Sequence, residues 1–133
     1  MEKGAGKTSQ RGGKRKGLVL VIEDDLDILS TVADILEFEG FQVVKAMNGE
    51  EGLAALQSAQ PALVLLDMRM PVLDGWEFAR IMKEQGIKVP ILVMTAARDA
   101  RRWAQEIGAQ GYVSKPFHLP DLVAAVEKTM QPE

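Results

Sequence analysis

Three runs of apolar residues stand out along the chain because no polar position interrupts them. They cover residues 18–22, 63–66 and 91–94 and consist of Val, Ile, Leu and Met. Short runs of this kind, without alternation of apolar and polar positions, are typical of strands buried on both faces, as in a parallel sheet covered by helices. The pattern therefore predicts three inner strands of a parallel sheet.

The segments between these runs carry apolar residues at helical spacing. The spacing predicts five helices, marked by apolar positions within residues 26–36, 53–56, 78–82, 100–107 and 119–130. Two shorter strands are predicted at residues 42–46 and 111–114. Asn48 followed by Glu51 resembles a capping box that opens the second helix, and Gly40 and Gly86 are typical helix ends. The chain thus divides into five consecutive βα units.

This alternation of strands and helices defines the fold class. Short connections between the elements imply a parallel sheet, and right-handed crossovers place helices on both of its faces. We predict an α/β protein of the flavodoxin-like (βα)5 type, a three-layer sandwich whose five-stranded parallel sheet has the strand order 2-1-3-4-5, as is typical of that fold. Residues 18–131 are expected to form this domain.

The composition agrees with a globular protein and excludes several other classes. The chain has 133 residues, of which 47% are hydrophobic and 26% charged. Its apolar runs are far shorter than the roughly 20 residues of a membrane-spanning helix, so we expect no membrane association. It has no cysteine, which excludes disulfides and zinc–cysteine sites and fits a reducing cytoplasm, the compartment that we expect.

Charge is divided unevenly along the chain. Residues 1–17 hold six basic residues and one acid, a net charge of +5, and since the whole chain carries −3, the remainder carries −8. This Gly-rich arm lacks the apolar side chains needed for burial, so we predict that it is disordered. A solubilising tail is the simplest interpretation, although a basic arm could also contact nucleic acid, an acidic partner or anionic lipid.

Polar residues suited to one kind of chemistry follow the predicted strands directly. The set comprises Glu23, Asp24, Asp25, Asp67, Thr95 and Lys115. The carboxyl ends of parallel strands meet at one edge of the sheet, where open α/β proteins bind their ligands. We therefore expect these side chains to lie close together at that edge.

Acids, a hydroxyl and an amine placed together suit phosphoryl chemistry. Clustered carboxylates repel one another unless a cation lies between them, and oxygen ligands without histidine or cysteine favour Mg²⁺. A carboxylate beside such a cation can attack a phosphoryl group and form an acyl phosphate. Thr95 would donate a hydrogen bond to one phosphoryl oxygen, and the Lys115 ammonium would neutralise another.

Four motifs, in order and at fitting spacings, point to a known family. They are residues 21–25, residues 66–71 with Asp74 and Gly75, residues 94–96, and residues 111–117. Over residues 17–130 the chain resembles the receiver domain of two-component response regulators, of the chemotaxis-regulator kind. The resemblance implies a signalling role in a phosphorelay.

The resemblance also implies a role for each acid. Asp67 would accept a phosphoryl group from a sensor histidine kinase, from a phosphotransfer protein or from a small phosphodonor. Asp24 and Asp67 would bind Mg²⁺ directly, and Glu23 would act through water. The main-chain carbonyl of Arg69 would be a third ligand.

By the same resemblance, Thr95 and Lys115 bind the phosphoryl group and signal its arrival. Thr95 would move toward the phosphate while Tyr112 rotates inward, which would remodel a protein-binding face made by the fourth helix, the fifth strand and the fifth helix. The Lys115–Pro116 peptide would be cis. The module would catalyse only its own phosphorylation and slow dephosphorylation, so we do not expect an enzyme in the usual sense.

Some assignments have more than one interpretation. Asp25 sits one place beyond the acidic pair, where it either contacts the metal or begins the first helix near its positive end. Arg69 and Ala97, two places beyond Asp67 and Thr95, would tune the lifetime of the phosphoryl group by the same resemblance. Whether Arg69 steers the phosphodonor or hinders the hydrolytic water does not follow from the sequence.

The overall function also has alternatives. The sequence ends soon after the last predicted helix, so we expect a stand-alone regulator that acts through a downstream protein target. The other classes are a phosphorylation-independent adaptor, a receiver fragment of a longer regulator, a small hydrolase with Asp67 as nucleophile, and a nucleic-acid protein that works through residues 1–17. The intact phosphoryl-binding set argues against the adaptor, and Arg69 stands where hydrolases of the haloacid-dehalogenase type require an acid. The segment before Tyr112 is slightly shorter than in the usual receiver, so the fourth helix departs most from the family.

Overall fold

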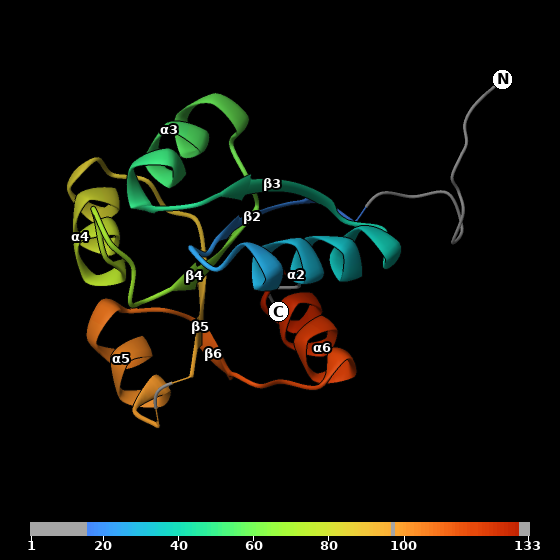
Figure 1. Ribbon diagram of the computed structural model, residues 1–133. Coiled ribbons are helices and arrows are strands. Elements are labelled where there is room, and N and C mark those ends of the chain that lie inside the picture. The colour runs from blue at the N-terminus through green and yellow to red at the C-terminus, as the bar shows by residue number, and fades with distance from the viewer. Residues whose placement is uncertain (1–15, 97, 131–133) are drawn as a thin grey trace, which may run out of the picture.

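The strands predicted from the sequence form one sheet. The computed structural model describes residues 16–96 and 98–130. The strands are β2 (Leu18–Ile22), β3 (Gln42–Ala46), β4 (Leu63–Asp67), β5 (Ile91–Thr95) and β6 (Gly111–Ser114). All neighbouring strands are parallel, in the order β3-β2-β4-β5-β6, which is the predicted order 2-1-3-4-5 (Figure 1).

Within the described residues, five helices cover the two faces of this sheet. They are α2 (Leu26–Phe38), α3 (Gly49–Ala59), α4 (Gly75–Glu84), α5 (Ala100–Ile107) and α6 (Leu119–Met130). Helices α2 and α6 pack on one face, and α3, α4 and α5 lie on the other (Figure 1). The prediction of a three-layer α/β sandwich of the flavodoxin-like type is therefore confirmed.

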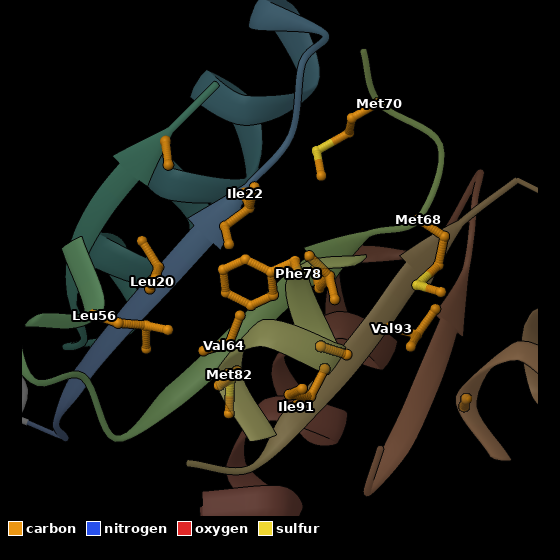
Figure 2. Packing of buried hydrophobic residues seen from close by; sticks show 14 of the residues in the cluster. Leu20, Ile22, Leu56, Val64, Met68, Met70, Phe78, Met82, Ile91 and Val93 are labelled. Carbon is orange, nitrogen blue, oxygen red and sulfur yellow. The ribbon is translucent and has the colours of Figure 1, made fainter. Parts of the chain in front are cut away.

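Burial on both faces of the sheet explains the uninterrupted apolar runs. Along β2, Leu20 and Ile22 belong to the layer that contains α3 and α4, whereas Val19 and Val21 belong to the layer that contains α2 and α6. Phe78 of α4 is fully buried at the centre of the first layer, as Figure 2 shows. Burial of one such side chain contributes about 1.5–3 kcal/mol. The ends of the strands are thus held by a densely packed core.

Side-chain caps fix where α3 and α4 begin. Asn48 Oδ1 accepts a hydrogen bond from the N–H of Glu51 at 2.9 Å, and Glu51 Oε1 accepts one from the N–H of Met47 at 2.7 Å. The predicted capping box therefore forms, with its return bond made to the residue before the cap. Asp74 caps α4 by accepting from the N–H of Glu77 at 3.0 Å. This cap fixes the start of the helix that follows the Asp67 loop.

Two residues that continue the apolar spacing of the helices lie at the surface. Leu26 and Leu119 are 55% and 52% exposed. Each is the first residue of its helix, α2 or α6, where the chain has left the sheet. Helical spacing gives the direction of an apolar face, but it does not give the point at which the sheet stops covering that face.

The predicted basic arm lies outside the described residues except for Lys16 and Gly17, so its disorder stays a prediction. Lys16 Nζ lies 2.8 Å from Glu127 Oε2 of α6, which ties the start of the domain to its last helix. Among the helices of the described part of the chain, none combines the length and the apolar character that a membrane crossing requires.

Candidate functional site

The carboxyl ends of four adjacent strands bring the predicted polar residues to one edge of the sheet. Glu23 follows β2, Asp67 ends β4, Thr95 ends β5 and Lys115 follows β6. The main-chain N–H of Lys115 donates to the carbonyl of Thr95 at 2.9 Å, which holds the last two of these ends together. The four side chains line an open cleft of about 580 Å³, whose other walls are Asp24, Asp25, Ile28, Arg69 and Ala96.

Three acids in this cleft form a candidate metal site. Glu23, Asp24 and Asp67 each offer a carboxylate oxygen, and these oxygens all lie within 4.8 Å of one another. Glu23 and Asp67 are buried, whereas Asp24 is exposed at the mouth of the cleft. The site is therefore closed on the side of the sheet and open on the side of Asp24.

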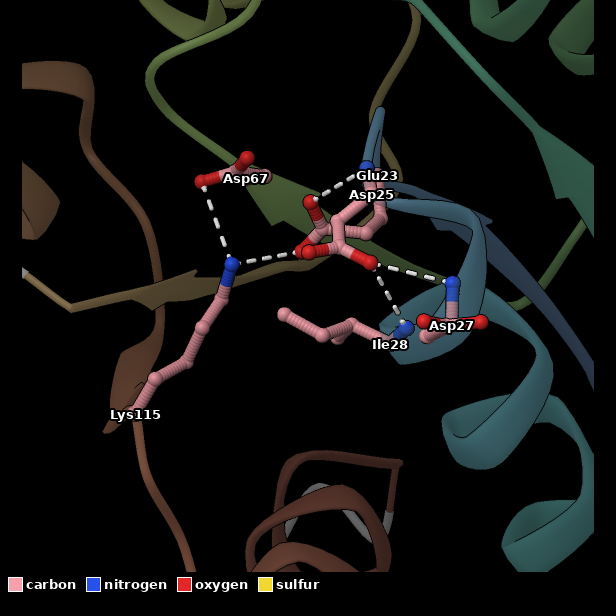
Figure 3. A network of polar contacts seen from close by, with 6 residues as sticks. All are labelled: Glu23, Asp25, Asp27, Ile28, Asp67 and Lys115. Atoms are coloured by element: carbon pink, nitrogen blue, oxygen red, sulfur yellow. Dashed lines mark hydrogen bonds and ion pairs between the residues drawn. The ribbon is translucent and has the colours of Figure 1, made fainter.

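Lys115 supplies the positive charge beside these acids. Its Nζ lies 2.6 Å from Glu23 Oε1 and 3.8 Å from Asp67 Oδ1, and Figure 3 shows the ammonium placed between the two carboxylates. The side chain is only 14% exposed. Sequence reasoning assigned Lys115 to the phosphoryl group and missed its pairing with Glu23. The available signal was that a buried acid requires a partner of opposite charge.

The carboxyl of Asp67 has an unusual affinity for protons. Burial raises its pKa, the charge and hydrogen bonding of Glu23 and the charge of Asp24 raise it further, and Lys115 lowers it, with a net change from 3.8 to about 7. At neutral pH the Asp67 carboxyl of the metal-free protein therefore holds a proton far more readily than an ordinary aspartate does. A cation that displaced this proton would return Asp67 to its charged, nucleophilic form.

The three acids fit a hard divalent cation. Their ligands are all oxygens, and Mg²⁺ takes oxygen ligands at about 2.0–2.1 Å in an octahedron, with ligand oxygens about 3–4 Å apart. The carboxylate oxygens of the three acids lie within 4.8 Å of one another, which is close to this range. The raised pKa of Asp67 also shows that the group gains from an added positive charge. The assignment of the Arg69 carbonyl as a ligand stays a prediction.

Asp25 begins the helix, as one of its two interpretations predicted. Its Oδ1 accepts hydrogen bonds from the N–H groups of Asp27 at 3.0 Å and Ile28 at 3.2 Å, which makes it the cap of α2 (Figure 3). Its own N–H donates to Glu23 Oε2 at 3.0 Å. Asp25 therefore positions Glu23, and its carboxylate is engaged by the helix.

The loop after Asp67 is held tightly in place. Met68 and Met70 are buried (Figure 2). The N–H of Gly75 donates to the carbonyl of Met68 at 2.9 Å, and a Cβ at Gly75 would lie 2.7 Å from the Met68 Cα. Val72 has φ +74°, a strained conformation for a β-branched residue. The buried methionines and the hydrogen bond of Gly75 fix the position of the residues that follow Asp67.

Tyr112 and His118 lie outside the cleft. Tyr112 is 44% exposed on β6, where it pairs in register with Val93 of β5. His118 is exposed just before α6. The predicted coupling of Thr95 to Tyr112 therefore stays a prediction, and Ala97 lies outside the described residues. The predicted cis peptide between Lys115 and Pro116 is confirmed.

Comparison with known families identifies the domain. A family model of the response regulator receiver domain matches residues 19–127, which is most of the chain. The chain belongs to this receiver family. The family assignment drawn from the four motifs is thereby confirmed, and receiver domains of this family typically bind Mg²⁺ at an acidic cluster such as the one described above.

Two curated relatives of this receiver are named as transcriptional regulatory proteins. Transcriptional regulatory protein CiaR of Streptococcus pneumoniae is 34% identical over 115 residues, which cover 85% of this chain and 51% of that protein. Transcriptional regulatory protein PrrA of Mycobacterium tuberculosis is 36% identical over 115 residues, covering 85% of this chain and 49% of that protein. The receiver chain thus spans about half the length of the curated relatives that it matches.

Solved receiver structures share the fold. Chemotaxis protein CheY4 of Vibrio cholerae has a TM-score of 0.77 at 29% identity, covering 84% of this chain and 97% of that chain. The receiver domain of the Francisella response regulator 1452 has a TM-score of 0.79 at 26% identity, covering 86% of this chain and 97% of that chain. Nearly every residue of these two chains has a counterpart in this receiver.

Proposed function

We propose that this receiver accepts a phosphoryl group on Asp67 from a histidine kinase or a phosphotransfer protein, in a reaction that requires Mg²⁺. The observation that carries the proposal is the position of Asp67 in the cleft. Its buried carboxylate ends a central strand, within 4.8 Å of carboxylate oxygens of Glu23 and Asp24, and 3.8 Å from the Lys115 ammonium. A nucleophile, a cation site and a counter-charge therefore meet at one point.

Each residue of the cleft has a separate role in the proposed phosphoryl transfer. Asp67 attacks phosphorus, so that a new P–O bond forms while the P–N bond of a donor phosphohistidine breaks and its electron pair stays on the imidazole nitrogen. Thr95 donates a hydrogen bond to one phosphoryl oxygen, and Lys115 neutralises another. Glu23, Asp24 and Asp67 would hold Mg²⁺, which when bound supplies positive charge to the acids and to the phosphoryl oxygens.

Output is proposed to pass through the face formed by α5, β6 and α6. Phosphorylation would draw Thr95 toward the phosphate and Tyr112 inward, and so shift the equilibrium between two conformations of this face. A downstream protein would bind one of these conformations more tightly. The family is a signalling module, and we propose that the chain catalyses only its own phosphorylation and dephosphorylation. We place it in the cytoplasm, as is general for response regulators. Stand-alone action stays a prediction, because the curated relatives are about twice as long as the matched region.

Intact mass spectrometry after incubation with acetyl phosphate tests the proposal. The wild type is expected to gain one phosphoryl mass with Mg²⁺ and none in EDTA, because the charged acids repel the phosphoryl group without a cation. Asp67→Asn should gain nothing. Asp34→Asn, a change to an exposed carboxylate on α2, is the matched control and should gain the same mass as the wild type. No gain in the folded wild type would favour a phosphorylation-independent adaptor.

A further inference from the structure

Arg69 connects the cleft to helix α5. It is the second residue after Asp67 and lines the cleft beside the acids. Its guanidinium carbon lies 5.1 Å from the centre of the Trp103 ring, within the range of a cation–π contact. Trp103 belongs to α5 and is only 6% exposed. One side chain thus reaches both the phosphoacceptor site and the buried face of a helix on the proposed output surface.

Trp103 is part of an aromatic pair that joins α5 to α4, the two neighbouring helices of one layer (Figure 1). The rings of Trp76 and Trp103 meet edge to face, with centres 4.8 Å apart and planes at 68°. Trp76 Nε1 donates to Glu106 Oε1 of α5 at 3.0 Å, and Arg102 Nε lies 3.7 Å from the other oxygen of Glu106. The position of α5 is therefore tied to the aromatic pair on which Arg69 rests.

Helix α5 is short and has no side-chain cap at its start. It has eight residues, which makes it the shortest helix in the described part of the chain. Asp99, which precedes the helix, makes no side-chain cap hydrogen bond. Its Oδ2 instead lies 3.3 Å from Arg102 Nη2. The first turn therefore lacks the anchor that Asp25 and Asp74 give to α2 and α4. A change at Trp103 should accordingly alter the position of this helix.

From this arrangement, and resting on the proposed function, we infer that Arg69 is a phosphoryl-sensing residue that exchanges its contact with Trp103 for the phosphoryl group on Asp67. A phosphoryl group adds up to about two negative charges to a cleft that Arg69 already lines. The guanidinium makes charge-assisted, bidentate hydrogen bonds to such a group, which are stronger than a partly exposed cation–π contact. Phosphorylation thereby removes the cation from the Trp103 ring and weakens one of the contacts that position α5.

Tryptophan fluorescence, recorded together with intact mass, tests this exchange. The parent is Trp76→Phe, in which Trp103 is the one remaining tryptophan. Acetyl phosphate with Mg²⁺ should change the Trp103 emission of the parent as its mass increases. Adding Arg69→Met should reduce that change roughly fivefold or more at the same phosphorylated fraction, because the cation is gone before the reaction starts. Arg101→Met, an exposed arginine of α5, is the control and should keep the full change.

Each contrary result has a separate meaning. An undiminished emission change in Arg69→Met, or a failure of that variant to gain mass while its parent does, overturns the exchange and leaves the phosphorylation of Asp67 standing. A parent that gains no mass overturns the proposed function and the exchange together. The same series in the wild-type background provides a second measurement should Trp76→Phe fold poorly, since both tryptophans of the chain belong to the pair.

Discussion

Asp67→Asn is expected to raise the free energy of unfolding of the metal-free protein by about 2–4 kcal/mol at pH 8. The carboxyl is 5% exposed, and burial together with Glu23 raises its pKa from 3.8 to about 7. At about 1.4 kcal/mol per pKa unit, the charged form carries a cost of about 4 kcal/mol in the folded state. An amide keeps the shape of the carboxyl without the charge and escapes this cost, although the attraction to Lys115 is lost with it.

The same pKa shift defines a pH range for the effect. Between about pH 4 and about pH 7 the folded state keeps a proton on Asp67 that the unfolded state has lost, so the stability of the wild type falls as pH rises through this range. Asp67→Asn does not lose stability in this way. The free energies of unfolding of the two proteins should therefore be similar near pH 4 and diverge toward pH 8. Urea unfolding in EDTA across this range, with Asp34→Asn as control, measures the difference. A difference that stays constant with pH would contradict the argument.

Lys115→Met is expected to lower the free energy of unfolding of the metal-free protein by about 3–5 kcal/mol. The ammonium lies 2.6 Å from Glu23 Oε1, and Glu23 is only 1% exposed. Removal of one partner of a buried ion pair leaves an uncompensated charge, whereas methionine keeps most of the apolar stem of lysine. The loss should therefore come from charge and not from a cavity.

Adding Mg²⁺ distinguishes a loss of stability caused by charge from one caused by a cavity. If the loss arises because three carboxylates have no cation beside them, Mg²⁺ should restore most of the lost stability. Mg²⁺ should also bind Lys115→Met more tightly than the wild type, because the ammonium no longer competes for Glu23. Unfolding curves with and without Mg²⁺ measure both effects. Lys128→Met, at an exposed lysine of α6, serves as the matched control. Unchanged stability in EDTA, or a loss that Mg²⁺ does not relieve, would mean that Lys115 does not neutralise this group.

The meeting of the site residues could be predicted because it depends on a local rule. Asp67 and Thr95 each follow an uninterrupted apolar run, and a run without alternation implies a strand buried on both faces. Once the strands are parallel, their carboxyl ends must share one edge of the sheet, whatever the helices between them do. The same reasoning placed Glu23 and Lys115 at that edge, although they are separated by 92 residues.

The pairings within the site could not be predicted in the same way. The sequence places Lys115 near several acids, but only the three-dimensional arrangement shows that its ammonium lies closest to Glu23. The contact between Arg69 and Trp103 likewise depends on how the loop after β4 passes the neighbouring α5. Such contacts depend on side-chain directions in separate elements, which periodicity does not record.

The central claim is that Asp67, and not a neighbouring acid, carries the phosphoryl group. Borohydride reduces an acyl phosphate to an alcohol and so converts a phosphorylated aspartate into homoserine. After reaction with acetyl phosphate and Mg²⁺ and then reduction, peptide mass mapping should find homoserine at Asp67 and unmodified Asp24 and Asp25. Conversion at Asp24 or Asp25, or a protein that gains phosphoryl mass with Asp67 unmodified, would contradict the account.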